Sequence, residues 1–120
     1  MDEPEVLATQ PGDLSQATVE ESLGGAFGSP LRFCEEIGST NTEALAWAKQ
    51  GAPEGALVVT NHQTQGRGRW GRSWSSAPGK LLQFSLVLRP AMEPGHLGLV
   101  TTALGVACAQ AIEALCGLDP

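Results

Sequence analysis

One short stretch of this sequence, residues 63–74, has residue types suited to binding an anion. It reads QTQGRGRWGRSW, in which three glycines alternate with three arginines and two tryptophans. Glycine lets backbone N–H groups approach a ligand closely, and each guanidinium offers a planar set of donors to phosphate or carboxylate. Glycine at every second or third position leaves no face that a helix or a strand could bury. We therefore predict a loop that is mobile until it closes on an anionic ligand.

Arginine-glycine repeats also occur in flexible RNA-binding segments and in solvated turns, so composition alone leaves these alternatives open. The loop lies between two strand-like segments, 56–62 and 81–89, and this setting favours a ligand loop on a rigid scaffold. No Asp or Glu occurs between Gly55 and Met92, where five of the seven basic residues fall, although the formal net charge is -6. An acidic protein with one basic window favours a small anionic ligand and argues against a nucleic-acid partner.

A second group of polar residues, Ser39, Thr40 and Asn41, precedes an expected helix over 41–50. Thr40 and Glu43 have the spacing of a capping box, in which a hydroxyl and a carboxylate each satisfy a free backbone N–H. These residues could act as a cap alone, or the helix N-terminus could also bind a polar ligand. The residue types leave both interpretations open.

The hydrophobic pattern predicts helices and strands on either side of these two groups. A short helix capped by Asp13 or Ser15 should reach about Leu23. Strands are expected over 31–37, 56–62 and 81–89, and an amphipathic helix over 96–116 should cover the sheet. In the last strand Leu82, Phe84, Leu86 and Leu88 alternate, as in a strand packed on one face. The expected fold is α+β, a mixed sheet with helices packed on one side of it.

Length and composition limit the remaining possibilities. The chain of 120 residues is one domain or less, and residues 1–13, acidic and rich in turn formers, should form a flexible arm. Its three cysteines are expected to be buried, reduced thiols. His62 is interpreted as a polar strand-end residue, because no acid or cysteine lies near it in the sequence, and no metal site is expected. The acidic N-terminus and the lack of an apolar run of membrane-spanning length predict a cytoplasmic protein with no membrane partner.

The polar motifs, taken in order and with their gaps, resemble those of the biotin protein ligases. The match extends from about Leu31 to Leu115, with Trp70 where the family often has another arginine. The resemblance implies a catalytic domain like that of class II aminoacyl-tRNA synthetases. The motifs that carry it are Ser39-Thr40-Asn41, Gln63, Gly66-Arg67-Gly68-Arg69-Trp70-Gly71-Arg72 and Trp74.

The resemblance also implies an activity with two half-reactions. Biotin and Mg²⁺-ATP would give biotinyl-5′-AMP and pyrophosphate, and the biotinyl group would pass to a lysine of a biotin carboxyl carrier protein domain. By position, the implied biotin-binding residues are Ser39, Thr40, Asn41, Gln63, Gly66, Arg67 and Arg69. Arg69 and Arg72 would act in catalysis on the carboxylate and phosphates, and with Trp74 they would bind the nucleotide.

The family's Lys-Trp-Pro-Asn-Asp segment does not occur in this sequence. Residues 14–120 are therefore expected to be the N-terminal part of the catalytic domain, truncated at its C-terminus, with little ligase turnover on its own. Two alternatives remain. One is a lipoate or octanoyl ligase of the same fold, whose Arg-Arg and triple-Gly pattern is not found here. The other is a non-enzymatic RNA-binding module that uses the arginine-glycine loop.

Overall fold

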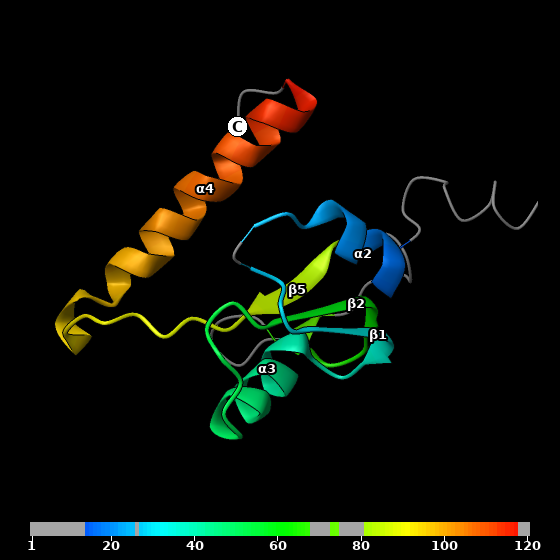
Figure 1. The fold of residues 1–120 in the computed structure, drawn as a ribbon, viewed down its shortest axis with the longest axis horizontal. Helices are drawn as coiled ribbons and strands as arrows, with labels where there is room; N and C mark the ends of the chain where they lie inside the picture. The colour runs from blue at the N-terminus through cyan, green and yellow to red at the C-terminus, as the bar shows by residue number, and fades with distance from the viewer. Residues whose placement is uncertain (1–13, 26, 68–72, 75–80, 118–120) are drawn as a thin grey trace, which may run out of the picture. The chain divides into compact units, whose positions relative to one another are not determined.

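The computed structural model describes residues 14–25, 27–67, 73–74 and 81–117, which belong to two units, Met1–Arg89 and Pro90–Pro120. The first unit contains a three-stranded sheet of order β1-β2-β5 (Figure 1). Strands β1 (Leu31–Ile37) and β2 (Leu57–Gln63) are parallel, and β5 (Gln83–Leu86) runs antiparallel to β2. The predicted mixed sheet of an α+β fold is confirmed. The domain boundaries 1–13 and 14–120 stay a prediction, and residues 1–13 lie outside the described part of the chain.

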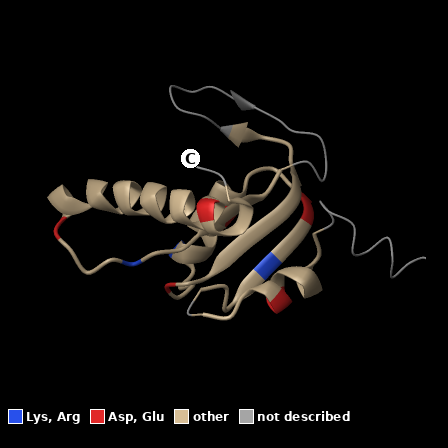
Figure 2. Cartoon of the chain, turned by 90° about the horizontal axis from the view of Figure 1, so that it is seen from above, with Lys and Arg blue, Asp and Glu red and all other residues tan. Residues whose placement is uncertain are grey.

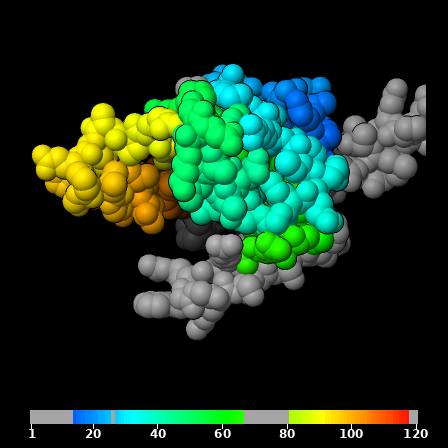
Figure 3. Space-filling view, turned by 90° about the horizontal axis from the view of Figure 1, so that it is seen from below, coloured from blue at the N-terminus to red at the C-terminus, as the bar shows by residue number. Residues whose placement is uncertain are grey.

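Two helices pack on this sheet. Helix α3 (Thr40–Lys49) connects β1 to β2 and packs against β2 and β5, and its surface is seen in Figure 3. Helix α2 (Gln16–Ser22) is capped by Ser15 and contacts β1. The two helices lie on opposite sides of the strands (Figure 1), so the prediction that the helices gather on one side was wrong.

The core lies between α3 and the central strand. Val58 and Thr60 of β2 are fully buried and Val59 is 2% exposed, because β2 has a neighbouring strand on each side and is covered on its faces. A β-branched run buried in this way favours a strand over a helix. The residues of the core cluster are Ala44, Ala52, Ala56, Val58 and Val87.

The apolar alternation in β5 has the opposite orientation to the predicted one. Leu82 and Phe84 are 66% and 48% exposed, whereas Gln83 is buried at 6%. The buried face holds Val87, which packs in the core under α3, and Ser85, which reaches the start of that helix. Side chains alternate along a strand, so this contact turns Leu82 and Phe84 away from α3.

The C-terminal end of α3 is closed by a residue from a distant part of the first unit. The guanidinium of Arg89 donates to the carbonyl oxygens of Ala48 at 2.8 Å and of Ala52 at 2.9 Å. These bonds tie Arg89 to the last turn of α3 and to the segment that follows it. Gly51 has a φ of 107°, a value that favours glycine and ends the helix as predicted.

The two ends of the arginine-glycine loop form a small ladder. Strand β3 (Gly66–Arg67) pairs antiparallel with β4 (Ser73–Trp74), with Gly66 opposite Trp74. The prediction that this segment would form no strand was wrong for its ends, because backbone pairing needs no side-chain face. Residues 68–72 lie outside the described residues.

The second unit consists of a 3-10 turn, η2 (Pro94–His96), and helix α4 (Gly98–Cys116). Helix α4 ends at Gly117, whose φ is 67°. Glu113 is its one charged residue (Figure 2), and no residue of the helix is buried. The expectation that this helix covers the sheet stays a prediction.

Two expectations, one about the length of apolar segments and one about the burial of the cysteines, do not hold as stated. Segment Pro94–Cys116, 23 residues with a mean hydropathy of 1.6 in its most apolar window, is long and apolar enough to cross a membrane. The prediction that no run reaches this length was therefore wrong, although the core helix of a soluble protein passes the same test. The cysteines are free, as expected, but Cys34 is partly exposed and Cys108 and Cys116 are exposed.

Candidate functional site

The start of α3 is capped by Ser39, not by the predicted pair of Thr40 and Glu43. The Ser39 hydroxyl accepts a hydrogen bond from the Thr42 N–H at 3.3 Å, and Ser39 has extended backbone angles. The Glu43 carboxylate instead pairs with the Arg32 guanidinium of β1 at 2.8 Å. The capping-box spacing was misleading because a cation on the neighbouring strand holds the glutamate.

The cap leaves Thr40 free to bond with Gln63 at the end of β2. The Gln63 Oε1 atom accepts from the Thr40 backbone N–H at 2.8 Å and from the Thr40 hydroxyl at 3.2 Å. A backbone N–H can only donate, so the amide oxygen must face Thr40 and the amide nitrogen must point away from it. Gln63 is 5% exposed, which makes this orientation well defined. The structure thus brings together two residues that sequence analysis had assigned to one site.

Ser85 of β5 joins the same network and was not predicted. Its hydroxyl lies 2.9 Å from the Thr40 Oγ1 atom, and it donates to Asn41 Oδ1 at 3.3 Å. Ser85 was not predicted because the buried face of β5 was assigned to the leucines and the phenylalanine. The signal that could have found it is a pair of polar residues, Gln83 and Ser85, at alternate positions of a strand flanked by apolar residues.

These polar groups line a hollow of about 280 Å³, called the polar hollow below. Its walls come from the end of β2, the first turn of α3 and the middle of β5. Its lining residues are Ser39, Thr40, Asn41, Thr42, Leu45, Gln63 and Ser85. The positive end of the α3 helix dipole, together with these polar side chains, makes this a favourable place for an acceptor or an anion.

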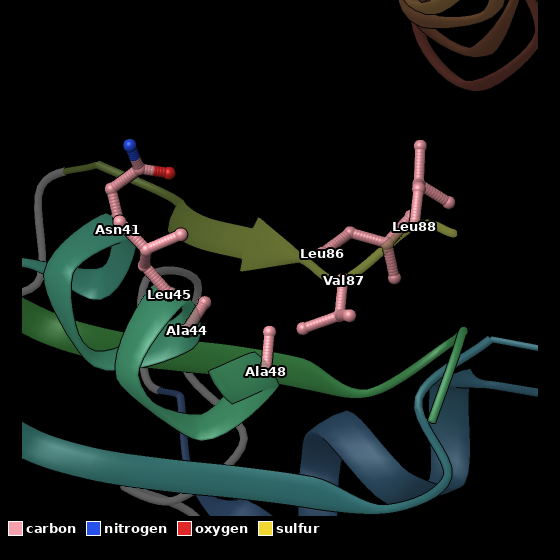
Figure 4. Close-up of a pocket in the computed structure, with 7 residues that line it drawn as sticks. All are labelled: Asn41, Ala44, Leu45, Ala48, Leu86, Val87 and Leu88. Carbon is pink, nitrogen blue, oxygen red and sulfur yellow. The ribbon is translucent and has the colours of Figure 1, made fainter. Parts of the chain in front are cut away.

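A second hollow of about 190 Å³, called the apolar hollow below, lies along α3 toward the C-terminal end of β5 (Figure 4). Asn41 and Leu45 line both hollows, so the two are neighbours. The apolar hollow is lined by Asn41, Ala44, Leu45, Ala48, Leu86, Val87 and Leu88. Together the polar hollow and the apolar hollow offer a polar end and an apolar end to one ligand.

The loop that follows Gln63 begins beside the polar hollow. The N–H groups of Thr64 and Gln65 donate to the carbonyl oxygens of Ile37 at 2.9 Å and of Gly38 at 2.6 Å, so the loop is anchored next to the Ser39 cap. Gly66, the next residue, is buried in β3. The backbones of Arg67 and Trp74 lie in β3 and β4, and Arg69 and Arg72 lie outside the described residues.

His62 has a partner that was not predicted. Its Nδ1 atom lies 3.2 Å from Glu36 Oε1 on β1, although the two residues are 26 positions apart in the sequence. The expectation that no acid would orient this histidine was wrong, because parallel pairing places Glu36 opposite it. In the described parts of the chain, no group of three or more His, Cys, Asp or Glu residues could hold a metal ion.

Comparison with known proteins agrees with this geometry. The model of the biotin/lipoate A/B protein ligase family matches residues 33–117. The chain belongs to this family. The family is described as one of protein ligases, so the predicted ligase family, the resemblance and the fold are confirmed.

Two relatives of this chain have names that describe them as ligases. The bifunctional ligase/repressor BirA of Bacillus spizizenii is 38% identical over 114 residues, which are 94% of this chain and 35% of that protein. The biotin--[acetyl-CoA-carboxylase] ligase of Mycobacterium tuberculosis is 32% identical over 112 residues, 89% of this chain and 42% of that protein. The chain thus spans about a third to two-fifths of the length of these curated relatives.

A solved structure shows the same arrangement. The biotin protein ligase of Leishmania major in complex with biotin aligns with a TM-score of 0.58 and 27% identity. The alignment covers 71% of this chain and 34% of that chain.

Proposed function

We propose that this chain supplies the biotin-binding part of an ATP-dependent biotin protein ligase. The observation that carries the proposal is the Gln63 amide, whose oxygen is held by Thr40 so that its nitrogen is left to donate to a ligand. The curated relatives are named as biotin ligases and the solved neighbour is described in complex with biotin, which supports the choice of ligand.

The polar hollow matches the ureido group of biotin in hydrogen-bonding capacity. That group has one carbonyl acceptor and two N–H donors. We assign the Gln63 Nε2 atom as a donor to the carbonyl, and the Ser85 hydroxyl and Asn41 Oδ1 as acceptors from the N–H groups. The Ser39 hydroxyl, beside them, and the apolar hollow, for the ring carbons and acyl chain, complete the proposed site.

The arginine-glycine loop would serve the activation step. The biotin carboxylate attacks the α-phosphorus of ATP, forming biotinyl-5′-AMP and releasing pyrophosphate. Both reactants are anionic, so Arg69 and Arg72 would offset their repulsion and stabilise charge in the transition state. Trp74 would pack near the adenine, and the Gly66 and Arg67 backbones would close over biotin and exclude water.

In the second step, a lysine amine of a carrier protein attacks the acyl carbon and AMP leaves. We propose a biotin carboxyl carrier protein domain as this partner, in the cytoplasm. Mg²⁺ would accompany ATP as activator, and the described residues contain no group of three or more His, Cys, Asp or Glu that would hold it.

A lipoate or octanoyl ligase is the second candidate, because the family includes lipoate ligases. Its substrate lacks the ureido group and would leave the donors and acceptors of the polar hollow unpaired. Unpaired buried polar groups are costly, so this site should prefer biotin.

Isothermal titration calorimetry with biotin on the 120-residue chain tests the proposal. Gln63→Met should weaken binding at least about tenfold, which corresponds to about 1.4 kcal/mol. Gln65→Met is the matched control, since Gln65 is exposed and does not line either hollow. Equal affinity of Gln63→Met and wild type, or tighter binding of lipoate than of biotin, would contradict the assignment.

A further inference from the structure

Thr60 is a buried polar residue that the proposed reaction does not use directly. It lies in the central strand β2, three positions before Gln63, and is 0% exposed. Its Oγ1 atom donates to the His62 carbonyl oxygen at 3.2 Å and accepts from the His62 N–H at 3.2 Å. One hydroxyl can make both bonds, because it has a donor and two acceptor lone pairs.

Packing alone does not explain a threonine here. Its neighbours Val58 and Val59 are equally buried and apolar, and valine has nearly the same shape as threonine. A buried hydroxyl is unfavourable unless it is hydrogen-bonded, and here both bonds go to the backbone of a single residue. The hydroxyl therefore serves to orient the backbone of the strand at His62 and not to fill volume in the core.

The residue that Thr60 holds is the one immediately before Gln63. A side-chain bond to the backbone two positions along is a local turn-type contact that competes with regular strand geometry. It acts at the end of the β1–β2 ladder, where His62 and Gln63 pair with Glu36 and Ile37. The path of the backbone at His62 decides where the Gln63 side chain begins.

We propose that Thr60 is a positioning residue for Gln63. Through the backbone of His62, its hydroxyl keeps the Gln63 amide in contact with the Thr40 N–H and its nitrogen directed at the ligand. This inference rests on the proposed biotin site, but its geometric part concerns the chain without ligand.

Two measurements on three variants of the whole chain test it. Thr60→Val removes the hydroxyl and keeps the shape, Thr60→Ser keeps the hydroxyl, and Val59→Ala destabilises the same buried strand without touching His62. Biotin affinity is measured by calorimetry. Hydrogen exchange of the Thr40 amide, relative to that of Val58, is measured by NMR without ligand.

Thr60→Val should differ from Val59→Ala, the control for stability, in both biotin affinity and Thr40 hydrogen exchange. We expect Thr60→Val to weaken biotin binding about three- to tenfold, the range for loss of one hydrogen bond, and to speed exchange at Thr40 relative to Val58. Thr60→Ser should restore both properties. Val59→Ala should lower the unfolding midpoint and leave both nearly as in wild type.

The outcomes separate this inference from the proposed function. If Thr60→Val and Val59→Ala have equal effects, or if Thr60→Ser fails to restore the Thr40 protection, Thr60 is only a core residue and the inference is overturned. If the wild-type chain binds no biotin but Thr60→Val still loosens Thr40, the positioning role holds and the proposed function is rejected.

Discussion

Thr40 and Gln63 form the central contact of the candidate site, and both the backbone and the side chain of Thr40 contribute to it. The N–H and the hydroxyl both bond to Gln63 Oε1, and the hydroxyl also lies 2.9 Å from the Ser85 hydroxyl. The backbone bond does not depend on the Thr40 hydroxyl. The hydroxyl can therefore be tested separately from the orientation of the Gln63 amide.

Thr40→Val should weaken biotin binding about three- to tenfold, because Ser85 loses a partner and the polar hollow gains a methyl group. The amide orientation should remain, since the Thr40 N–H still bonds to Gln63. Calorimetry gives the affinity, and the NMR shifts of the Gln63 side-chain amide report its environment.

Thr64→Val is the control for Thr40→Val, because Thr64 is exposed and lines neither hollow. It should bind biotin as wild type does. A Thr40→Val chain with unchanged affinity would show that the hydroxyl plays no part in binding.

At the scale of elements, α3 is held at each end by different kinds of contact. Its start is capped locally by Ser39, and its end is closed by Arg89 from beyond β5. The local cap and the long-range contact make α3 a stable support for the polar hollow.

Ser39→Ala should lower the free energy of unfolding by about 1 kcal/mol, the usual effect of losing an N-cap hydroxyl. Glu43→Gln should have a smaller effect, because the Arg32 and Glu43 side chains are 41% and 37% exposed and such ion pairs contribute little. Urea unfolding followed by circular dichroism measures both. A larger loss for Glu43→Gln than for Ser39→Ala would restore the capping box as the main cap.

At the scale of the whole molecule, the described residues expose much apolar surface. Leu82 of the first unit is 66% exposed, and Leu99 and Leu115 of α4 are 62% and 85% exposed. A helix that is apolar on all sides is normally buried in a core or in a membrane. Exposed apolar surface of this extent favours association.

We expect the 120-residue chain to self-associate as its concentration rises, measured by size-exclusion chromatography with light scattering. Leu99→Lys should reduce the association, because it places a charge in the apolar surface of α4. Gln110→Lys, at an exposed position of the same helix, adds the same charge without removing apolar area and is the control. A chain that is monomeric at every concentration would contradict this prediction.

Short-range signals in the sequence were sufficient for most elements of the fold. The strand over 31–37, the helix capped by Ser15 and the glycine stops at Gly51 and Gly117 depend on residues close together in the chain. Gln63 and Thr40, by contrast, are far apart in the sequence and were assigned to one site only through the resemblance to biotin protein ligases. Caps, turns and hydrophobic periods act over a few residues, so they can be recognised without a fold.

Only the tertiary structure decided which partners meet across elements. It placed Ser85 rather than Phe84 on the face toward α3, drew Glu43 to Arg32 and left the cap to Ser39, and set Glu36 beside His62. Each choice depends on strand register, and a shift of one residue would turn every side chain of a strand to the other face. Register follows from pairing between distant segments and from the space under α3, which local sequence patterns do not specify.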